Sequence, residues 1–127
     1  MSASFNHRFL GLTEEQASFR ETAERFAREV LAPRSRQFEK DGTIPPDVRS
    51  AMGEFGLIGV EFPQEFGGLA VDHVTSGVVI EAIAEGDFNV AYAQLLGSLC
   101  GTIIARHAAP DIAAAVLPRI CRGDAVV

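Results

Sequence analysis

The sequence predicts an all-α fold, a bundle of about five to six helices with one ordered loop rich in glycine and proline. Apolar residues recur every three to four positions over most of the 127 residues, the spacing that places one helix face on a core. The interruption is residues 56–68, where glycines and Pro63 surround a short apolar run. Because this loop carries so many apolar side chains, we expect it to pack against helices on both sides.

Helix start and stop signals divide the first half of the chain. Thr13 and Gln16 form a capping-box sequence, which predicts that a helix begins there. Pro33 ends or kinks that helix, and residues 34–41 continue as a second segment before a glycine. A double proline then predicts a short helix over residues 46–56.

Aspartate and proline mark the helix starts of the second half. Asp72 caps one helix, and Asp87 caps the longest helix, over about residues 88–106. A last helix begins at Pro110 and stops at Gly123. The residues of this last helix that are predicted to face inward are Ile112, Val116, Leu117 and Ile120.

Glu81 lies in the most apolar stretch of the sequence, residues 78–84. A helix that is apolar all round is buried, so Glu81 needs a partner, for which Arg49 or Arg106 is available. One interpretation makes Glu81 a general base with a raised pKa. The other, which we favour, makes it a structural carboxylate paired with an arginine or a helix end.

The long helix over residues 88–106 has two different faces. Small residues on one face recur every fourth position and predict that another backbone approaches closely, since glycine otherwise costs helix stability. These small residues are Ala93, Gly97, Gly101 and Ala105. The other face carries large apolar side chains and one hydroxyl, which by residue type alone indicates ordinary core. Its residues are Tyr92, Leu95, Leu96, Leu99 and Ile103.

Composition argues against several classes of function. The net charge of −6 and the 11 scattered basic residues argue against nucleic-acid binding. We find no apolar run of about 18 residues and no signal-peptide pattern, so we expect a cytoplasmic protein that does not enter a membrane. Cys100 and Cys121 lie in apolar segments and predict buried, reduced thiols. Histidine and cysteine spacing predicts no metal site, and no phosphate-binding loop is found.

Several short segments, in order and at the expected spacing, resemble the acyl-CoA dehydrogenase family. Residues 63–68, Pro-Gln-Glu-Phe-Gly-Gly, are similar to the Pro-x-x-x-Gly-Gly loop of the N-terminal helical domain in that family, and residues 56–60 precede it at the expected distance. Further matches are Thr13-Glu14-Glu15-Gln16 and Glu81-Ala82-Ile83-Ala84 followed by Asp87 and Val90. The resemblance covers residues 10–127.

The resemblance implies a division of the chain. Residues 1–11 become a flexible lead-in, residues 12–124 the N-terminal helical domain, and residues 125–127 the start of a β-domain that this sequence lacks. Enzymes of the family are much longer, with FAD held by the β-domain and the catalytic carboxylate in a C-terminal helical domain. The resemblance therefore implies no catalytic, cofactor-binding or metal-binding residue in this chain, and FAD only in the parent enzyme.

The implied function is the α,β-dehydrogenation of an acyl-CoA thioester by the parent, with an electron-transfer protein as its partner. In the family, one face of the long helix borders the acyl-chain pocket, which places Tyr92, Leu95, Leu96 and Leu99 against substrate. We expect the chain alone to be inactive, to bind FAD weakly or not at all, and to self-associate. The alternatives are a non-catalytic helical binding or assembly module with the same fold, and a plain bundle whose resemblance is coincidental.

Overall fold

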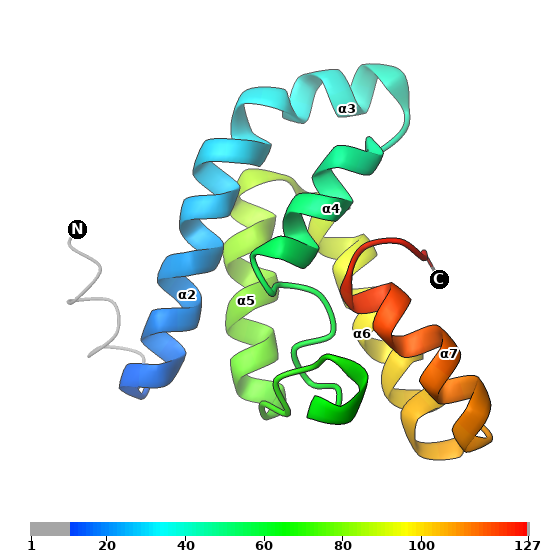
Figure 1. Cartoon of the computed structure of the whole chain (residues 1–127). Coiled ribbons are helices and arrows are strands. Elements are labelled where there is room, and N and C mark those ends of the chain that lie inside the picture. The colour runs from blue at the N-terminus through cyan, green and yellow to red at the C-terminus, as the bar shows by residue number, and fades with distance from the viewer. Residues whose placement is uncertain (1–10, 127) are drawn as a thin grey trace.

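The computed structural model describes residues 11–126, which form a helical bundle without a strand (Figure 1). The predicted all-α class is therefore confirmed for this part of the chain. The α-helices are α2 (Glu14–Phe26), α3 (Ser35–Asp41), α4 (Pro46–Glu54), α5 (His73–Gly86), α6 (Phe88–His107) and α7 (Pro110–Cys121). The predicted flexible lead-in lies outside the described residues except for Gly11.

Four of the helices pack side by side in a row. α2 packs on α5, α5 on α6, and α6 on α7, while α3 lies across one end (Figure 1). The capping box is present, since Thr13 Oγ1 accepts from Gln16 N and Gln16 Oε1 accepts from Thr13 N, both at 3.1 Å. After α2 the backbone stays helical, first in a π-helical stretch, Ala27–Leu31, and then in a 3-10 turn, Ala32–Arg34. Pro33 therefore kinks the helix and does not end it.

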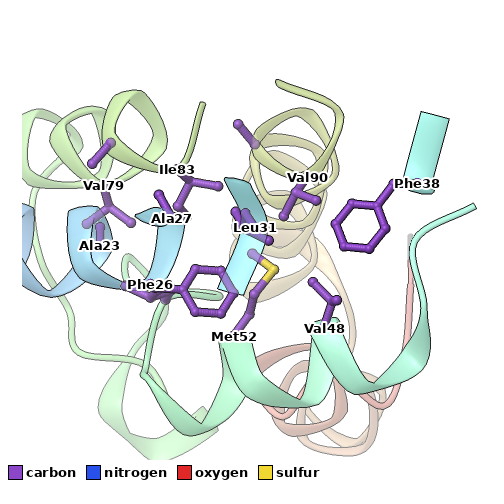
Figure 2. Close-up of a cluster of buried hydrophobic side chains, with 13 residues drawn as sticks. Ala23, Phe26, Ala27, Leu31, Phe38, Val48, Met52, Val79, Ile83 and Val90 are labelled. Carbon is purple, nitrogen blue, oxygen red and sulfur yellow. The ribbon is translucent and has the colours of Figure 1, made fainter. Parts of the chain in front are cut away.

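The main core gathers the apolar faces of α2, α4 and α5 and the start of α6 (Figure 2). Phe26 is fully buried and its ring centroid lies 5.4 Å from that of Phe55. Met52 of α4 points toward Leu31 and lies beside Phe26 in Figure 2. A smaller second cluster joins the loop to α7 and consists of Phe62, Ala113, Leu117, Ile120 and Cys121.

The loop over residues 56–68 packs inside the bundle, as predicted. Leu57, Val60 and Phe62 are buried on it. Gly67 takes the left-handed conformation, with φ 92°, at the end of a 3-10 turn, Gln64–Phe66. Gly68 does not have positive φ; a Cβ there would overlap the Phe62 carbonyl, so close approach is what requires glycine.

Several side chains lie elsewhere than the sequence pattern predicted. Glu81 is exposed, because Gly77, Glu81 and Glu85 recur every fourth residue and form the solvent face of α5. The predicted pairing of Glu81 with Arg49 or Arg106 is therefore wrong. Ile112 is exposed on α7, and Cys100 is only half-buried. Ala125 and Val126 belong to no strand, and Val127 lies outside the described residues.

Candidate functional site

α6 is held at its start by a buried aspartate. Asp87 Oδ1 accepts from Val90 N at 2.9 Å, which caps the helix, and Asp87 Oδ2 accepts from Ser35 Oγ of α3 at 2.6 Å. The helix then runs for 20 residues with its two faces in different surroundings. The start of α6 is thus fixed relative to α3.

The outward face of α6 is an exposed apolar stripe. We define the apolar stripe as Phe88, Tyr92, Leu95, Leu99 and Ile103, which are 72%, 52%, 41%, 56% and 53% exposed. Three of the four predicted substrate-binding residues, Tyr92, Leu95 and Leu99, lie on it, and Leu96 is half-buried at its edge. The interpretation of this face as ordinary core is wrong, because no element among residues 11–126 covers it.

The face with small residues meets side chains and not another backbone. The Phe62 ring lies so close to Gly101 that a Cβ there would overlap it. A Cβ on Gly97 would lie 3.8 Å from Ile120 Cγ2, an ordinary contact. The small residues therefore leave room for the Phe62 ring of the loop and for the Ile120 side chain of α7. The prediction that another backbone approaches this face closely is wrong.

A narrow apolar groove lies between α4, α6 and the end of α7. Its lining includes Met52, Ile58, Ala93, Gly97 and Ile120. It adjoins a wider open pocket of about 500 Å³ beside the α3–α4 connection, which shares Arg49, Ala93 and Val126 with it. Sequence analysis missed this groove, although the small side chains at 93 and 97 were the available signal.

Two buried polar groups border the same groove. Gln94 is 2% exposed and donates from Nε2 to the Leu57 carbonyl at 3.2 Å, which ties α6 to the loop. Gln94 Oε1 and Arg49 Nε have no hydrogen-bond partner within the described structure. The Arg49 side chain is held on its other side, because Nη1 donates to the Ile44 carbonyl at 3.0 Å.

A second polar cluster surrounds Glu61 of the loop. Ser98 Oγ of α6 donates to Glu61 Oε1, and His73 Nδ1 of α5 lies against Oε2, both at 2.6 Å. Burial acts to raise the pKa of Glu61, but the contacts with Ser98 and His73 favour the ionised carboxylate and leave the pKa below its ordinary value. The carboxylate thus fastens the loop to two helices.

This cluster is not arranged for nucleophilic catalysis. A serine nucleophile needs an imidazole within hydrogen-bond reach to take its proton, whereas Ser98 donates to the carboxylate and His73 bonds to the other carboxylate oxygen. Among residues 11–126, no group of three or more histidine, cysteine or acidic side chains has the arrangement of a metal site. The structure therefore offers an apolar surface and groove as its candidate site.

No apolar run of about 18 residues was found in the sequence, but α6 is, by length and composition, the one described helix long and apolar enough to cross a membrane. Its apolar window has a mean hydropathy of 1.4, and one third of that window is buried within the bundle. The core helix of a globular domain meets the same criterion, and Gln94 and Ser98 of this helix are engaged by the loop. Absence from the membrane stays a prediction.

The fold and site define a helical domain whose longest helix presents one apolar face outward and closes an apolar groove with the other. Residues 13–124 match the family described as acyl-CoA dehydrogenase, N-terminal domain. The chain belongs to this family. The match excludes a coincidental resemblance, since it covers nearly the whole described bundle.

Curated relatives agree with the family and are much longer. The 2-methylacyl-CoA dehydrogenase of Solanum tuberosum is 29% identical over 117 residues, which are 89% of this chain and 28% of the relative. The (2S)-methylsuccinyl-CoA dehydrogenase of Cereibacter sphaeroides is 30% identical over 115 residues, 90% of this chain and 21% of the relative. The chain thus spans less than a third of the length of these relatives.

Solved structures share the fold. A chain from the work on the electron transferring flavoprotein of Acidaminococcus fermentans superposes with a TM-score of 0.83 at 28% identity, over 91% of this chain and 30% of that one. A glutaryl-CoA dehydrogenase from Mycobacterium smegmatis in complex with FADH2 also gives a TM-score of 0.83, over the same shares, at 22% identity. This second likeness concerns the fold alone.

Proposed function

We propose that the chain is the N-terminal helical domain of a flavin-dependent acyl-CoA dehydrogenase, which removes two hydrogens across the α,β bond of an acyl-CoA thioester. The observation that carries the proposal is the family match over residues 13–124. The names of the curated relatives, all of them dehydrogenases of acyl-CoA compounds, support it. We further propose that the chain alone is inactive.

The two adjoining pockets described above, within residues 11–126, do not fit FAD. A pyrophosphate needs several convergent N–H donors or cations, as at a glycine-rich helix start. The two adjoining pockets share one guanidinium, Arg49, and one of its terminal nitrogens is engaged by the Ile44 carbonyl. We therefore assign flavin binding to other polypeptide. The proposed role of this chain is to orient the acyl group and keep water from it.

We propose that α6 supplies one wall of the acyl-chain pocket. The residues predicted for this wall are Tyr92, Leu95, Leu96 and Leu99. The exposure of the apolar stripe, which no element among residues 11–126 covers, supports this assignment. The groove face of α6 is a second candidate wall. It is favoured by one observation, that Ala93 and Gly97 leave an apolar space beside Ile58 and Ile120.

The two walls are distinguished by chain-length preference in the product of the complete reading frame. Leu99→Ala widens a pocket on the stripe, so we expect it to shift preference toward longer or bulkier thioesters. Gly97→Ala narrows the groove without overlap, since the new methyl would lie 3.8 Å from Ile120 Cγ2. The measurement is flavin bleaching with a series of acyl-CoA thioesters. Ile112→Ala, at an exposed position of α7, is the control.

If Gly97→Ala shifts the chain-length preference and Leu99→Ala does not, the acyl chain lies in the groove and not on the stripe. If the complete product neither bleaches flavin nor binds a thioester, the alternative of a non-catalytic helical module takes its place.

We also propose that the parent passes electrons to an electron-transfer protein and acts in the cytoplasm. Co-purification of the complete product with its acceptor and cell fractionation test these two points.

A further inference from the structure

We propose that the narrow groove between α4, α6 and α7 binds a small apolar 2-hydroxy acid, with the carboxylate on Arg49 of α4 and the hydroxyl on Gln94 of α6. Both residues line the groove. Each contributes one buried polar atom, Arg49 Nε and Gln94 Oε1, that has no hydrogen-bond partner within residues 11–126. A buried donor or acceptor without a partner costs free energy, so a ligand that supplies both partners is stabilised here.

The guanidinium of Arg49 is held in place with one edge open. Nη1 donates to the Ile44 carbonyl at 3.0 Å, which fixes the group, and the edge formed by Nε and Nη2 has no partner within the described part of the chain. Arg49 also forms no ion pair among residues 11–126. A carboxylate accepts two parallel N–H bonds from such an edge and supplies the missing negative charge. An anionic ligand is therefore preferred to a neutral one.

Gln94 adds an acceptor that a carboxylate cannot satisfy. Its Nε2 donates to the Leu57 carbonyl at 3.2 Å, which orients the amide and leaves Oε1 as the atom without a partner. The residue is 2% exposed. Oε1 needs an O–H or N–H donor from the ligand. A hydroxyl beside the carboxylate supplies that donor without bringing a second charge into an apolar groove, as an ammonium group would.

The two adjoining pockets divide the ligand into a polar end and an apolar body. The narrow groove has a volume of about 40 Å³, which is room for about three water-sized groups. Arg49 lines both pockets, so it lies where the groove meets the wider pocket of about 500 Å³. Phe38, Ile44 and Val126 in the lining of the wider pocket suit a branched apolar body. Glu39 lines the wider pocket but not the groove, so repulsion between carboxylates also favours the polar end in the groove.

An NMR titration of the 127-residue chain tests the ligand class, because the Nε–H of Arg49 reports directly on a carboxylate that binds it. Three probes share one apolar body: 2-hydroxyisocaproate, isocaproate, which lacks the hydroxyl, and isocaproamide, which also lacks the charge. We expect saturable shifts of the Arg49 and Gln94 side-chain resonances with 2-hydroxyisocaproate, binding of isocaproate weaker by about fivefold or more, and no binding of the amide. Equal binding of the three probes, saturable shifts only at other residues, or no saturable shift overturns the proposal.

Arg49→Met tests the anchor, because it removes the guanidinium and keeps a long apolar side chain. We expect it to weaken the binding of 2-hydroxyisocaproate by about tenfold or more, and Arg49→Lys, which keeps the charge but not the paired N–H edge, to restore only part of the affinity. Arg28→Met is the matched control, since Arg28 is exposed on the π-helical stretch and its loss changes the net charge equally. Unchanged binding by Arg49→Met, or equal weakening in Arg28→Met, overturns the assignment.

The comparison of the three probes uses the unaltered chain, so it decides the proposal even where an Arg49 variant fails to fold. The outcome is also separate from the proposed dehydrogenase function. It measures the binding of free acids by this chain and not the turnover of a thioester by a longer protein.

Discussion

Gly101 of α6 has the tightest surroundings among the interior residues considered above. The Phe62 ring of the loop occupies the space that a Cβ at this position would need. Glycine costs a helix about 1 kcal/mol relative to alanine. The fully buried ring offsets that cost, since burying a phenylalanine side chain contributes roughly 1.5–3 kcal/mol. The loop and α6 thus depend on each other through one contact.

We expect Gly101→Ala to lower the free energy of unfolding by about 1–3 kcal/mol, because the ring has to shift within a packed core. Gly77→Ala is the matched control, since Gly77 is also helical but has no atom within 4 Å of a built Cβ. That change should raise the free energy of unfolding by about 0.5–1 kcal/mol. Urea unfolding measures both, and a stabilised Gly101→Ala variant would contradict the close contact.

The loop over residues 56–68 is fastened by a polar contact as well as by its apolar side chains. Glu61 reaches Ser98 of α6 and His73 of α5, so one carboxylate bridges three elements. Because its pKa is lowered in the folded state, the ionised form stabilises the fold above the ordinary glutamate pKa of about 4.3. That contribution is lost as the pH falls through the lower folded-state pKa.

We expect Glu61→Gln to lower the free energy of unfolding at neutral pH and to flatten its decline between about pH 5 and pH 3. A neutral amide keeps the shape but loses the charge that favours the bonds to Ser98 and His73. Chemical unfolding at several pH values measures this slope. Glu65→Gln, at an exposed position of the same loop, serves as the control, and equal slopes for the two variants would rule out the role given to Glu61.

The domain as a whole presents its longest helix to the outside. The apolar stripe of α6 lacks cover among residues 11–126, and the chain spans 28% of the length of the Solanum tuberosum relative. Both facts agree with a domain that buries this surface against something else. The proposed acyl-pocket wall is one such use of that surface.

We expect the 127-residue chain to bind FAD weakly or not at all, because its two adjoining pockets offer one guanidinium and mostly apolar walls. Equilibrium titration followed by flavin fluorescence measures this affinity, with free riboflavin as the control for stacking on exposed Tyr92. A yellow protein that retains stoichiometric FAD through gel filtration would refute the assignment of flavin binding to other polypeptide.

Helix boundaries and the packed loop were determined by the sequence itself. The capping box at Thr13, the aspartate caps at Asp72 and Asp87, and the left-handed Gly42 all depend on residues within one helical turn. Local signals of this kind are complete in a short stretch of chain. The family resemblance, carried by the same short segments, was likewise readable without a structure.

Only the tertiary structure decided which apolar residues are covered. Glu81 lies outside because α2 and α6 pack on other sides of α5, and Leu95 and Leu99 lie outside because α5 and α7 pack on other sides of α6. An apolar helix has the same sequence pattern whether its neighbours belong to this chain or to another. Burial is a property of the assembled helices, so the exposed stripe became visible only when they were placed together.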